Sequence, residues 1–504
     1  MIESGLLYLW NFFQISMKRF SLMLCCMMTA IFSCIHFTSC IDDERKDDKQ
    51  VEENDSIEME RKTLLAQRYY MKQYYTDFFP IYYWYDDVEK RVSRLSYNNF
   101  SSIFDYFDAT LYSEDHWSWM MTGDEYVALE SGDQTGTYGF SLGQALEYYD
   151  DYSIRVRFIY PGSPLEQYGV TRGWELTHLD SIPVMDLVAT GRFYDLLYKD
   201  DQSFTFKDLK GETHSFVCSP ASSLFVHSSL RAQVFRPGDY PGITESVGYF
   251  LYMSFMEGDF LKDIDDAMSM FKEAGVRKLI LDLRYNGGGS MLAADALVNY
   301  LAPESANNKV YYKTIHNRQL SMLNDNDTVH RKKGSLDLDA LYIIGGGNTA
   351  SASEVTINGL KPFMNVYLVG DTTYGKPNGM YVLMYPDTDT DYDRYDAGDY
   401  SDHELVFLPI AFFNRNGRNE PIPYNGFIPD NYRPDDIKHD FGVEEDNIKA
   451  CLEHMVNGSF PALPGLFSTQ MKGSVSERQL QIPDDIITSP LYGSTLLPLP
   501  KELR

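Results

Sequence analysis

Short apolar runs separated by helical stretches fill the middle of the chain. Residues 341–344 form one such run, which breaks at the three glycines 345–347, and residues 350–360 then hold small residues and helix formers. Residues 366–369 form the next apolar run. This pattern predicts a strand, a tight turn, a helix and a neighbouring buried strand. Ser351 stands at the junction between the predicted turn and the predicted helix.

A second apolar run is also followed by a glycine-rich turn and a helical stretch. Residues 278–283 lead into the glycine-rich turn 286–289, and residues 292–301 then have helical spacing. Turns of this kind also bind phosphates, but neither the dinucleotide Gly-x-Gly-x-x-Gly spacing nor a Gly-Lys-Ser/Thr follows. A further strand is predicted at 247–255. Alternation of strands and helices predicts an α/β core over residues 240–455.

Three regions outside this core have different patterns. Residues 64–135 show helical spacing with many aromatic residues, which predicts an N-terminal helical bundle whose aromatic side chains form its core. Residues 136–232 carry short strands separated by turns and predict a separate domain. Residues 456–504 are rich in proline and serine and are expected to form a loosely packed tail.

The composition is that of a globular chain of two or three domains, since 44% of its 504 residues are hydrophobic and 14% aromatic. A net charge of −29 argues against nucleic acid as a partner, because phosphates need lysine and arginine. Four of the six cysteines lie between residues 25 and 40, so only Cys218 and Cys451 lie beyond this region. Neither a disulfide framework nor a catalytic cysteine is indicated.

The N-terminus has the pattern of a targeting segment. The basic residues 18–19 precede an apolar stretch, 20–37, so residues 1–39 are predicted to be a signal peptide with Met17 as the true start. An uncleaved membrane anchor is the alternative, because the stretch is nearly long enough to span a bilayer. The charged residues 40–63 are expected to be a tether.

Ser351 and Lys376 are the candidate chemistry. The first N–H groups of a helix beside Ser351 would bind a developing oxyanion. The loop after residues 366–369 carries Lys376 back towards the same edge of the sheet, where it would serve as a base. An ordinary lysine pKa of about 10.4 is too high for that role, but burial among apolar groups lowers it. Serine-rich turns and Lys-Pro pairs also occur without any catalytic role.

The two motifs together resemble those of the C-terminal processing, or tail-specific, serine peptidases. The shared residues are Thr-Ala-Ser-Ala-Ser-Glu around Ser351, Tyr-Gly-Lys ending at Lys376, and Asp-Leu-Arg-x-Asn-x-Gly-Gly ending at Gly289. The resemblance implies a core related to the crotonase and Clp protease folds and a Ser-Lys dyad, with Ser351 as nucleophile and Lys376 as general base. It implies that the oxyanion donors are the N–H of Ala352 and that of Gly287 or Gly288.

Residues 136–232 are similar to the PDZ domain inserted in these peptidases. PDZ domains bind a C-terminal carboxylate through backbone N–H groups and add the peptide to a sheet edge. The resemblance assigns that role to five consecutive residues: Tyr138, Gly139, Phe140, Ser141 and Leu142. The pair Trp174-Glu175 departs from the family, which has aspartate and valine there.

Residues 37–40, Phe-Thr-Ser-Cys, resemble a lipobox, so Cys40 is the predicted lipidated terminus. The acidic residues that follow resemble a surface-export signal of Gram-negative lipoproteins. We therefore expect an exported lipoprotein, outer-membrane, periplasmic or surface-facing. Its expected partners are polypeptide substrates, with their C-terminal tails as one route of recognition.

The match to the family is incomplete around the lysine. Positions where relatives hold an orienting aspartate or glutamine are Pro362 and Met380 here. Glu354 is a candidate for the orienting role or simply a helix cap. His116 is expected to be structural. A catalytically inactive, peptide-binding lipoprotein on the same scaffold is therefore the alternative function.

No metal or organic cofactor is expected. The acidic residues 387–393 resemble a calcium loop in spacing alone, since the glycine and glutamate that such a loop needs are missing. A solvated loop is the expected structure there.

Overall fold

The computed structural model describes residues 64–462 and 495–498, except 124, 127–132, 135, 146–150, 198, 257 and 386–404. By its contacts the chain divides into two units, residues 1–67 and 68–504, and the elements below belong to the second unit. Within the described residues, no helix combines the length and the apolar character needed to cross a membrane. The mixed α/β architecture expected from the sequence is confirmed.

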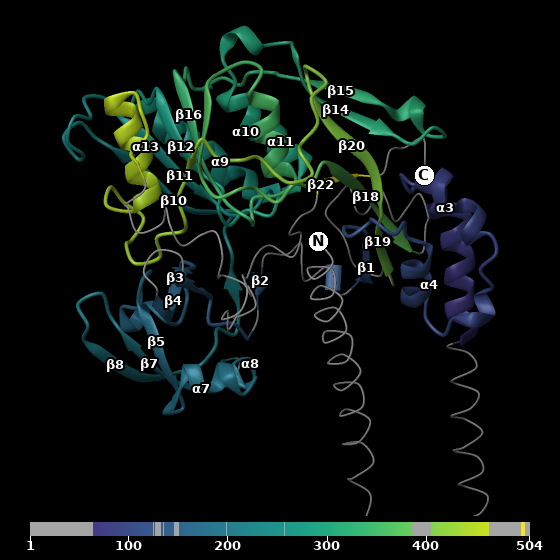
Figure 1. Ribbon diagram of the computed structural model, residues 1–504, viewed down its shortest axis with the longest axis horizontal. Coiled ribbons are helices and arrows are strands. Elements are labelled where there is room, and N and C mark those ends of the chain that lie inside the picture. The colour runs from purple at the N-terminus through teal and green to yellow at the C-terminus, as the bar shows by residue number, and fades with distance from the viewer. Residues whose placement is uncertain are drawn as a thin grey trace, which may run out of the picture. The chain divides into compact units, whose positions relative to one another are not determined.

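The core is built on a six-stranded sheet (Figure 1). Its order is β10-β11-β12-β16-β17-β21; β10 is antiparallel to β11, and all other neighbours are parallel. Parallel strands are covered on both faces, which explains their continuous apolar runs. The bounds are β10 (Ser229–Phe235), β11 (Val247–Tyr252), β12 (Lys278–Asp282), β16 (Ala340–Gly345), β17 (Val366–Gly370) and β21 (Asn431–Tyr432).

Helices cover this sheet, and alternate strand residues enter two different apolar cores. Leu279 and Leu281 join the core that includes α9, α10 and α11, whereas Ile280 joins the core that includes α13. Successive strand side chains point to opposite faces, so the two cores lie on the two sides of the sheet. The bounds are α9 (Leu261–Glu273), α10 (Met291–Leu301), α11 (Ala352–Leu360) and α13 (Asp446–Asn457).

A second sheet has eight strands, in the order β1-β19-β18-β20-β14-β15, with β22 pairing to both β13 and β18. Its bounds are β1 (Trp119–Thr122), β13 (Gly289–Ser290), β14 (Val310–His316), β15 (Asp325–Thr328), β18 (Asn378–Tyr385), β19 (Leu405–Leu408), β20 (Ile410–Asn416) and β22 (Thr495–Pro498).

The N-terminal helices pack on this second sheet. Aromatic residues between 71 and 107 share one core with β18, β19 and β20, and Phe407 of β19 stacks on Tyr74 at a centroid distance of 5.3 Å. A helical bundle with a core of its own over 64–135 is therefore not confirmed, since β1 within this range also pairs with β19. The elements of the second unit here are helical residues 68–73, η1 (Tyr74–Phe78), η2 (Phe79–Ile81), α3 (Tyr85–Val92), η3 (Tyr97–Asn99) and α4 (Ile103–Thr110).

Residues 136–232 hold an antiparallel sheet in the order β3-β4-β5-β7-β8, with β6 on β5, and this sheet has its own apolar core. The bounds are β3 (Phe140–Ala145), β4 (Asp151–Ile159), β5 (Glu175–Leu179), β6 (Ile182–Pro183), α7 (Val184–Ala189), α8 (Phe193–Leu197), β7 (Gln202–Lys207) and β8 (Thr213–Cys218). The remaining elements are β2 (Asp133–Gln134), η4 (Glu166–Tyr168), β9 (Leu224–Phe225), η5 (Gly258–Phe260), η6 (Glu304–Ala306) and η7 (Ser321–Leu323).

Candidate active site

Ser351 lies between the turn after β16 and the start of α11, so the predicted strand, turn and helix are confirmed. Its φ is +57° and its ψ is −113°, a conformation that costs a non-glycine residue about 1–3 kcal/mol. Thr349 holds the turn: its Oγ1 accepts from the Gly346 N–H at 2.9 Å and donates to the Leu283 carbonyl at 2.8 Å. The serine is therefore buried and held in a strained geometry by its neighbours.

The two glycine-rich turns are tied together through Asn286. Its carbonyl accepts from the Ala350 N–H at 3.3 Å and from the Ser353 hydroxyl at 3.0 Å. Its side-chain amide donates to the Tyr252 carbonyl at 3.0 Å. The turn after β12 is thereby fixed beside the N-terminus of α11.

The predicted oxyanion donors differ in how they are occupied. Ala352 is the first residue of α11, where an N–H has no acceptor within its helix. The Gly288 N–H donates to Asn286 Oδ1 at 2.9 Å. Among the described residues, the Gly287 N–H donates no hydrogen bond. Of the two glycines left open by the sequence, Gly287 is the one whose donor is available.

Glu354, on the first turn of α11, joins the serine turn to the lysine loop. It accepts from the backbone N–H groups of Ser351 at 3.1 Å, Gly375 at 2.8 Å and Lys376 at 2.8 Å. It also accepts from the Thr373 hydroxyl at 2.6 Å. Burial raises the pKa of the Glu354 carboxyl, although these hydrogen bonds partly oppose the effect. Glu354 both caps the helix and positions the backbone of Lys376.

Lys376 is buried, and burial lowers the pKa of its amine to about 7. The negative charges of Asp115 and Glu354 act in the opposite direction and raise the pKa of the amine. With this pKa, about half of the amine is unprotonated at pH 7 and can accept a proton, whereas an ordinary lysine is almost wholly protonated. The side chain thus has the property that a general base requires.

Asp115 is a residue of this site that the sequence did not single out. Its buried carboxylate accepts from the Tyr82 hydroxyl at 2.7 Å, from the N–H of Trp117 at 2.9 Å, and from the Ser118 hydroxyl at 2.6 Å. His116, which drew notice in the sequence, is exposed, with its ring 6.1 Å from that of Trp117. The only signal in the sequence was that Asp115 stands next to His116. Its effect on the pKa of Lys376 depends on the fold.

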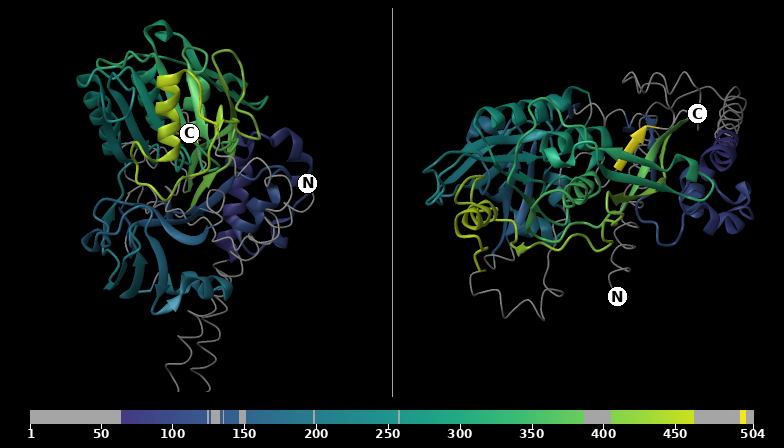
Figure 2. Two further views of the ribbon diagram at one scale, coloured as in Figure 1. Left: turned by 60° about the vertical axis from the view of Figure 1, so that its left-hand side comes forward. Right: turned by 90° about the horizontal axis from the view of Figure 1, so that it is seen from above.

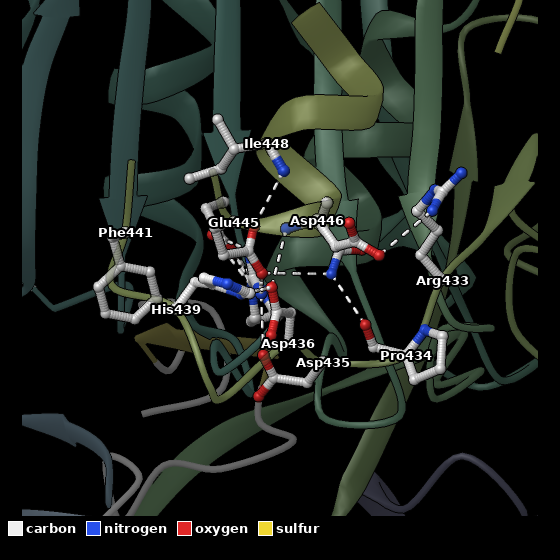
Figure 3. A network of polar contacts seen from close by, with 12 residues as sticks. Arg433, Pro434, Asp435, Asp436, His439, Phe441, Glu445, Asp446 and Ile448 are labelled. Carbon is white, nitrogen blue, oxygen red and sulfur yellow. Dashed lines mark hydrogen bonds and ion pairs between the residues drawn. The ribbon is translucent and has the colours of Figure 1, made fainter. Parts of the chain in front are cut away.

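Behind the oxyanion turn lies a buried ionic network. Arg284 Nη2 donates to Asp282 Oδ2 at 2.8 Å, and its Nη1 donates to Glu445 Oε1 at 2.6 Å and to Asp435 Oδ1 at 2.9 Å. Glu445 in turn caps α13 by accepting from the Ile448 N–H at 2.9 Å. Figure 3 shows Asp435 and Glu445 close together near the start of α13. The network joins Asp282 and Arg284 of the Asp-Leu-Arg motif to the segment that leads into α13.

Arg172 connects this network to the antiparallel sheet of residues 136–232. Its Nη2 donates to Asp435 Oδ1 at 2.7 Å, and its Nη1 donates to the Tyr285 hydroxyl at 2.8 Å. Burial raises the pKa of Asp435, but Arg172 and Arg284 more than offset this and hold it below its ordinary value. One arginine therefore links that sheet to the residue next to Asn286 in the oxyanion turn.

The five residues predicted to bind peptide lie at the start of the antiparallel sheet. Tyr138 is buried and donates to the Lys199 carbonyl at 2.6 Å, and Gly139 adopts a φ of +62°. Residues 140–142 open β3, which pairs with β4 and is the last strand on its side of this sheet among the described residues. An edge strand in this place is compatible with strand addition.

Some predictions lie outside the described residues, namely the signal peptide at 1–39, the lipidation of Cys40, the tether at 40–63 and the solvated loop at 387–393. In the part of the chain that the structure describes, potential metal ligands converge at Asp208, Glu212 and His214, whose ligand atoms lie within 4.8 Å of one another. They stand on the hairpin between β7 and β8, which contains none of the residues of the candidate active site.

A serine in a tight turn between a strand and a helix, a buried lysine with a lowered pKa and a nearby backbone N–H donor are groups of the kind that serine hydrolases use. Comparison with known proteins narrows this class. Residues 246–430 match the model of Peptidase family S41. The resemblance drawn from the sequence is thereby confirmed.

Curated relatives agree with this assignment. Carboxyl-terminal-processing peptidase 1, chloroplastic, of Arabidopsis thaliana is 26% identical over 52% of this chain, which spans about half (51%) of the relative's length. Carboxy-terminal processing protease CtpA of Bacillus subtilis is 29% identical over 29% of each chain. The chain therefore spans about half or less of the length of these relatives.

A solved structure matches over a greater length. A protein assigned to the S41 proteases from Bacteroides fragilis NCTC 9343 superposes with a TM-score of 0.61 at 21% sequence identity, covering 77% of this chain and 97% of that one. The likeness establishes the fold.

Proposed function

We propose that this protein is a serine endopeptidase of the C-terminal processing type that works through a Ser351–Lys376 dyad. The observation that carries the proposal is the state of Lys376, a buried amine with a pKa of about 7 whose backbone is tied to the Ser351 turn through Glu354. The catalytically inactive alternative is not favoured, because a peptide-binding scaffold has no need of a lysine held in this state.

The reaction would proceed through an acyl-enzyme. Ser351 Oγ attacks the scissile carbonyl carbon while Lys376 Nζ takes the hydroxyl proton, and the N–H groups of Ala352 and Gly287 stabilise the oxyanion. Collapse of the tetrahedral intermediate breaks the C–N bond, and the leaving amine receives the proton from Lys376. Water then attacks the ester carbonyl carbon and gives a proton to the same amine. Collapse of this second intermediate breaks the bond between the carbonyl carbon and Ser351 Oγ, which takes the proton back from Lys376 as the carboxylic acid product leaves.

The experiment is cleavage of a chemically unfolded protein by the chain from Ile41 onward. Ser351→Ala should abolish cleavage, and Lys376→Met should lower it by about 10³-fold. Ser321→Ala and Lys361→Met change exposed residues outside this site and should cleave like the wild type. Cleavage that persists in Ser351→Ala would refute the proposal.

The antiparallel unit at 136–232 is proposed to act as a PDZ-like domain that binds C-terminal tails. Its support is the open edge of β3 and the positive φ at Gly139, which suit strand addition after a carboxylate-binding loop. A fluorescent peptide with a free C-terminus should bind, and its C-terminal amide should bind far more weakly. Equal binding of the two would reject the domain's proposed role.

Lipid attachment at Cys40 and a site at the outer membrane remain proposals that rest on the sequence around residues 37–40. Cells fed a clickable palmitate analogue should label the wild-type protein and leave Cys40→Ser unlabelled. Labelling of both proteins, or of neither, would contradict them.

A further inference from the structure

The C-terminal strand β22 (Thr495–Pro498) lies between two strands that leave the candidate active site. It runs parallel to β13, with Thr495 opposite Gly289, and parallel to β18, with Leu496 opposite Met380. In the right-hand view of Figure 2 the yellow arrow of β22 lies beside the green strands of this sheet.

Both neighbours of β22 continue directly from the catalytic motifs. β13 begins at Gly289, immediately after the glycines of the oxyanion turn, and β18 begins at Asn378, two residues after Lys376. The last described segment of the chain therefore lies between the segment that carries an oxyanion donor and the segment that carries the base.

β22 fills a slot one strand wide. Met380 pairs with Ile410 of β20 and with Leu496 of β22, so these two partners occupy opposite edges of β18. Gly289 likewise pairs with Phe255 as well as Thr495. Without β22, the edges of β13 and β18 that face each other would have no strand partner among the described residues. Unpaired edges readily accept another extended chain.

We propose that the slot between β13 and β18 is a binding site for an extended, uncharged polypeptide segment, occupied in cis by residues 495–498. The inference rests on the proposed function and adds a regulation to it. Recognition is through main-chain hydrogen bonds, and Pro498 ends the ladder because it has no N–H to donate. A polypeptide that enters from outside must displace the tail, so occupancy lowers the apparent affinity for it.

The first test uses the full chain with Leu496→Pro, which removes an N–H from the strand, and with Thr495→Pro as a second variant. Leu503→Pro, outside β22, is the matched control. Each of the first two variants should cleave an unfolded protein several-fold faster at low substrate concentration, through a lower KM, while the control is unchanged. A synthetic peptide of residues 491–504 should restore the slower rate. Unchanged or slower cleavage by both variants would overturn the proposal.

A second measurement separates this inference from the proposed function. The same peptide, fluorescently labelled, should bind Ser351→Ala/Leu496→Pro more tightly than Ser351→Ala alone, because only the former has an empty slot. This outcome does not depend on catalysis, so a failure of all cleavage would refute the peptidase while leaving the slot supported. Equal binding to the two proteins would refute the slot.

Discussion

Two clusters of buried charged residues, one around Arg284 and one around Lys376, have opposite effects on the charge of the cation at their centre. In the network behind the oxyanion turn, Arg284 donates directly to Asp282, Asp435 and Glu445. In the candidate active site, the hydrogen bonds described for Glu354 come from backbone N–H groups and from one hydroxyl. Arg284 keeps its charge, whereas the pKa of Lys376 falls to about 7.

The comparison shows that a buried cation stays charged and forms ion pairs when carboxylates offset its burial fully, and has a lowered pKa when they offset it only in part. Burial disfavours the charge of both cations, but close carboxylates restore the charge of the arginine and raise its pKa. The carboxylates near Lys376 oppose its burial only in part. A lysine is suited to this role because its pKa moves readily, whereas a guanidinium stays charged.

The largest expected effect comes from removing the base. Lys376→Met should lower kcat/KM by about 10³-fold, since general-base catalysis contributes about 10² to 10⁴. The fold should be kept, because a buried amine is replaced by an apolar chain of similar length. Lys361→Met, an exposed lysine, is the control, and a similar loss there would indicate a general effect of lysine removal.

The next effect concerns the arginine network. Arg284→Met leaves Asp282 buried without its cation and leaves Glu445 with only the more distant Arg172, 3.9 Å away, so it should lower the free energy of unfolding by about 3–5 kcal/mol. Urea denaturation would measure it. Arg277→Met removes a solvent-exposed pair with Asp339 and should leave stability unchanged. Equal effects of the two substitutions would contradict the contrast drawn above.

Part of the candidate site was predictable from the sequence alone. The Ser351 and Gly287 turns were predictable because an apolar run broken by glycines determines its own local structure. The choice between Gly287 and Gly288 was not, since it depends on where the Asn286 side chain points.

Contacts between residues that lie far apart in the sequence could not be predicted either. Most of the aromatic residues before 110 were correctly predicted to be core, although Tyr69 is exposed. The pattern does not say that a sheet rather than other helices covers them. Arg172 and Asp435 lie far apart in the chain, and the influence of Asp115 on Lys376 arises only once the segment before β1 is placed by the β1–β19 pairing. Periodicity carries no information about such partners.

A smaller effect should follow from weakening the link at Glu354. Glu354→Gln loses the acceptor strength of a carboxylate and replaces one oxygen by a donor that faces backbone N–H groups. We expect a loss of about 1–3 kcal/mol in stability and a lower kcat. Thermal unfolding and steady-state kinetics would measure both. Glu273→Gln, at the exposed end of α9, should change neither.

The smallest effect should come from Asp115→Asn. The charge of Asp115 raises the pKa of Lys376, so its removal should lower that pKa and move the rising limb of the pH–rate profile to lower pH, by up to about one unit. Cleavage below pH 7 should then increase relative to the maximum. Asp105→Asn, an exposed aspartate of α4, should leave the limb in place. A shift to higher pH would contradict the assigned role of Asp115.

The central claim, that Lys376 is a base active near neutral pH, is tested most directly by the rate at which a fluorophosphonate probe labels Ser351 between pH 5 and pH 11. The account predicts labelling that rises with pH to half its maximum near the Lys376 pKa of about 7 and is lost in Lys376→Met. A half-maximum near the ordinary lysine pKa of about 10.4, or equal labelling of Lys376→Met, would contradict it.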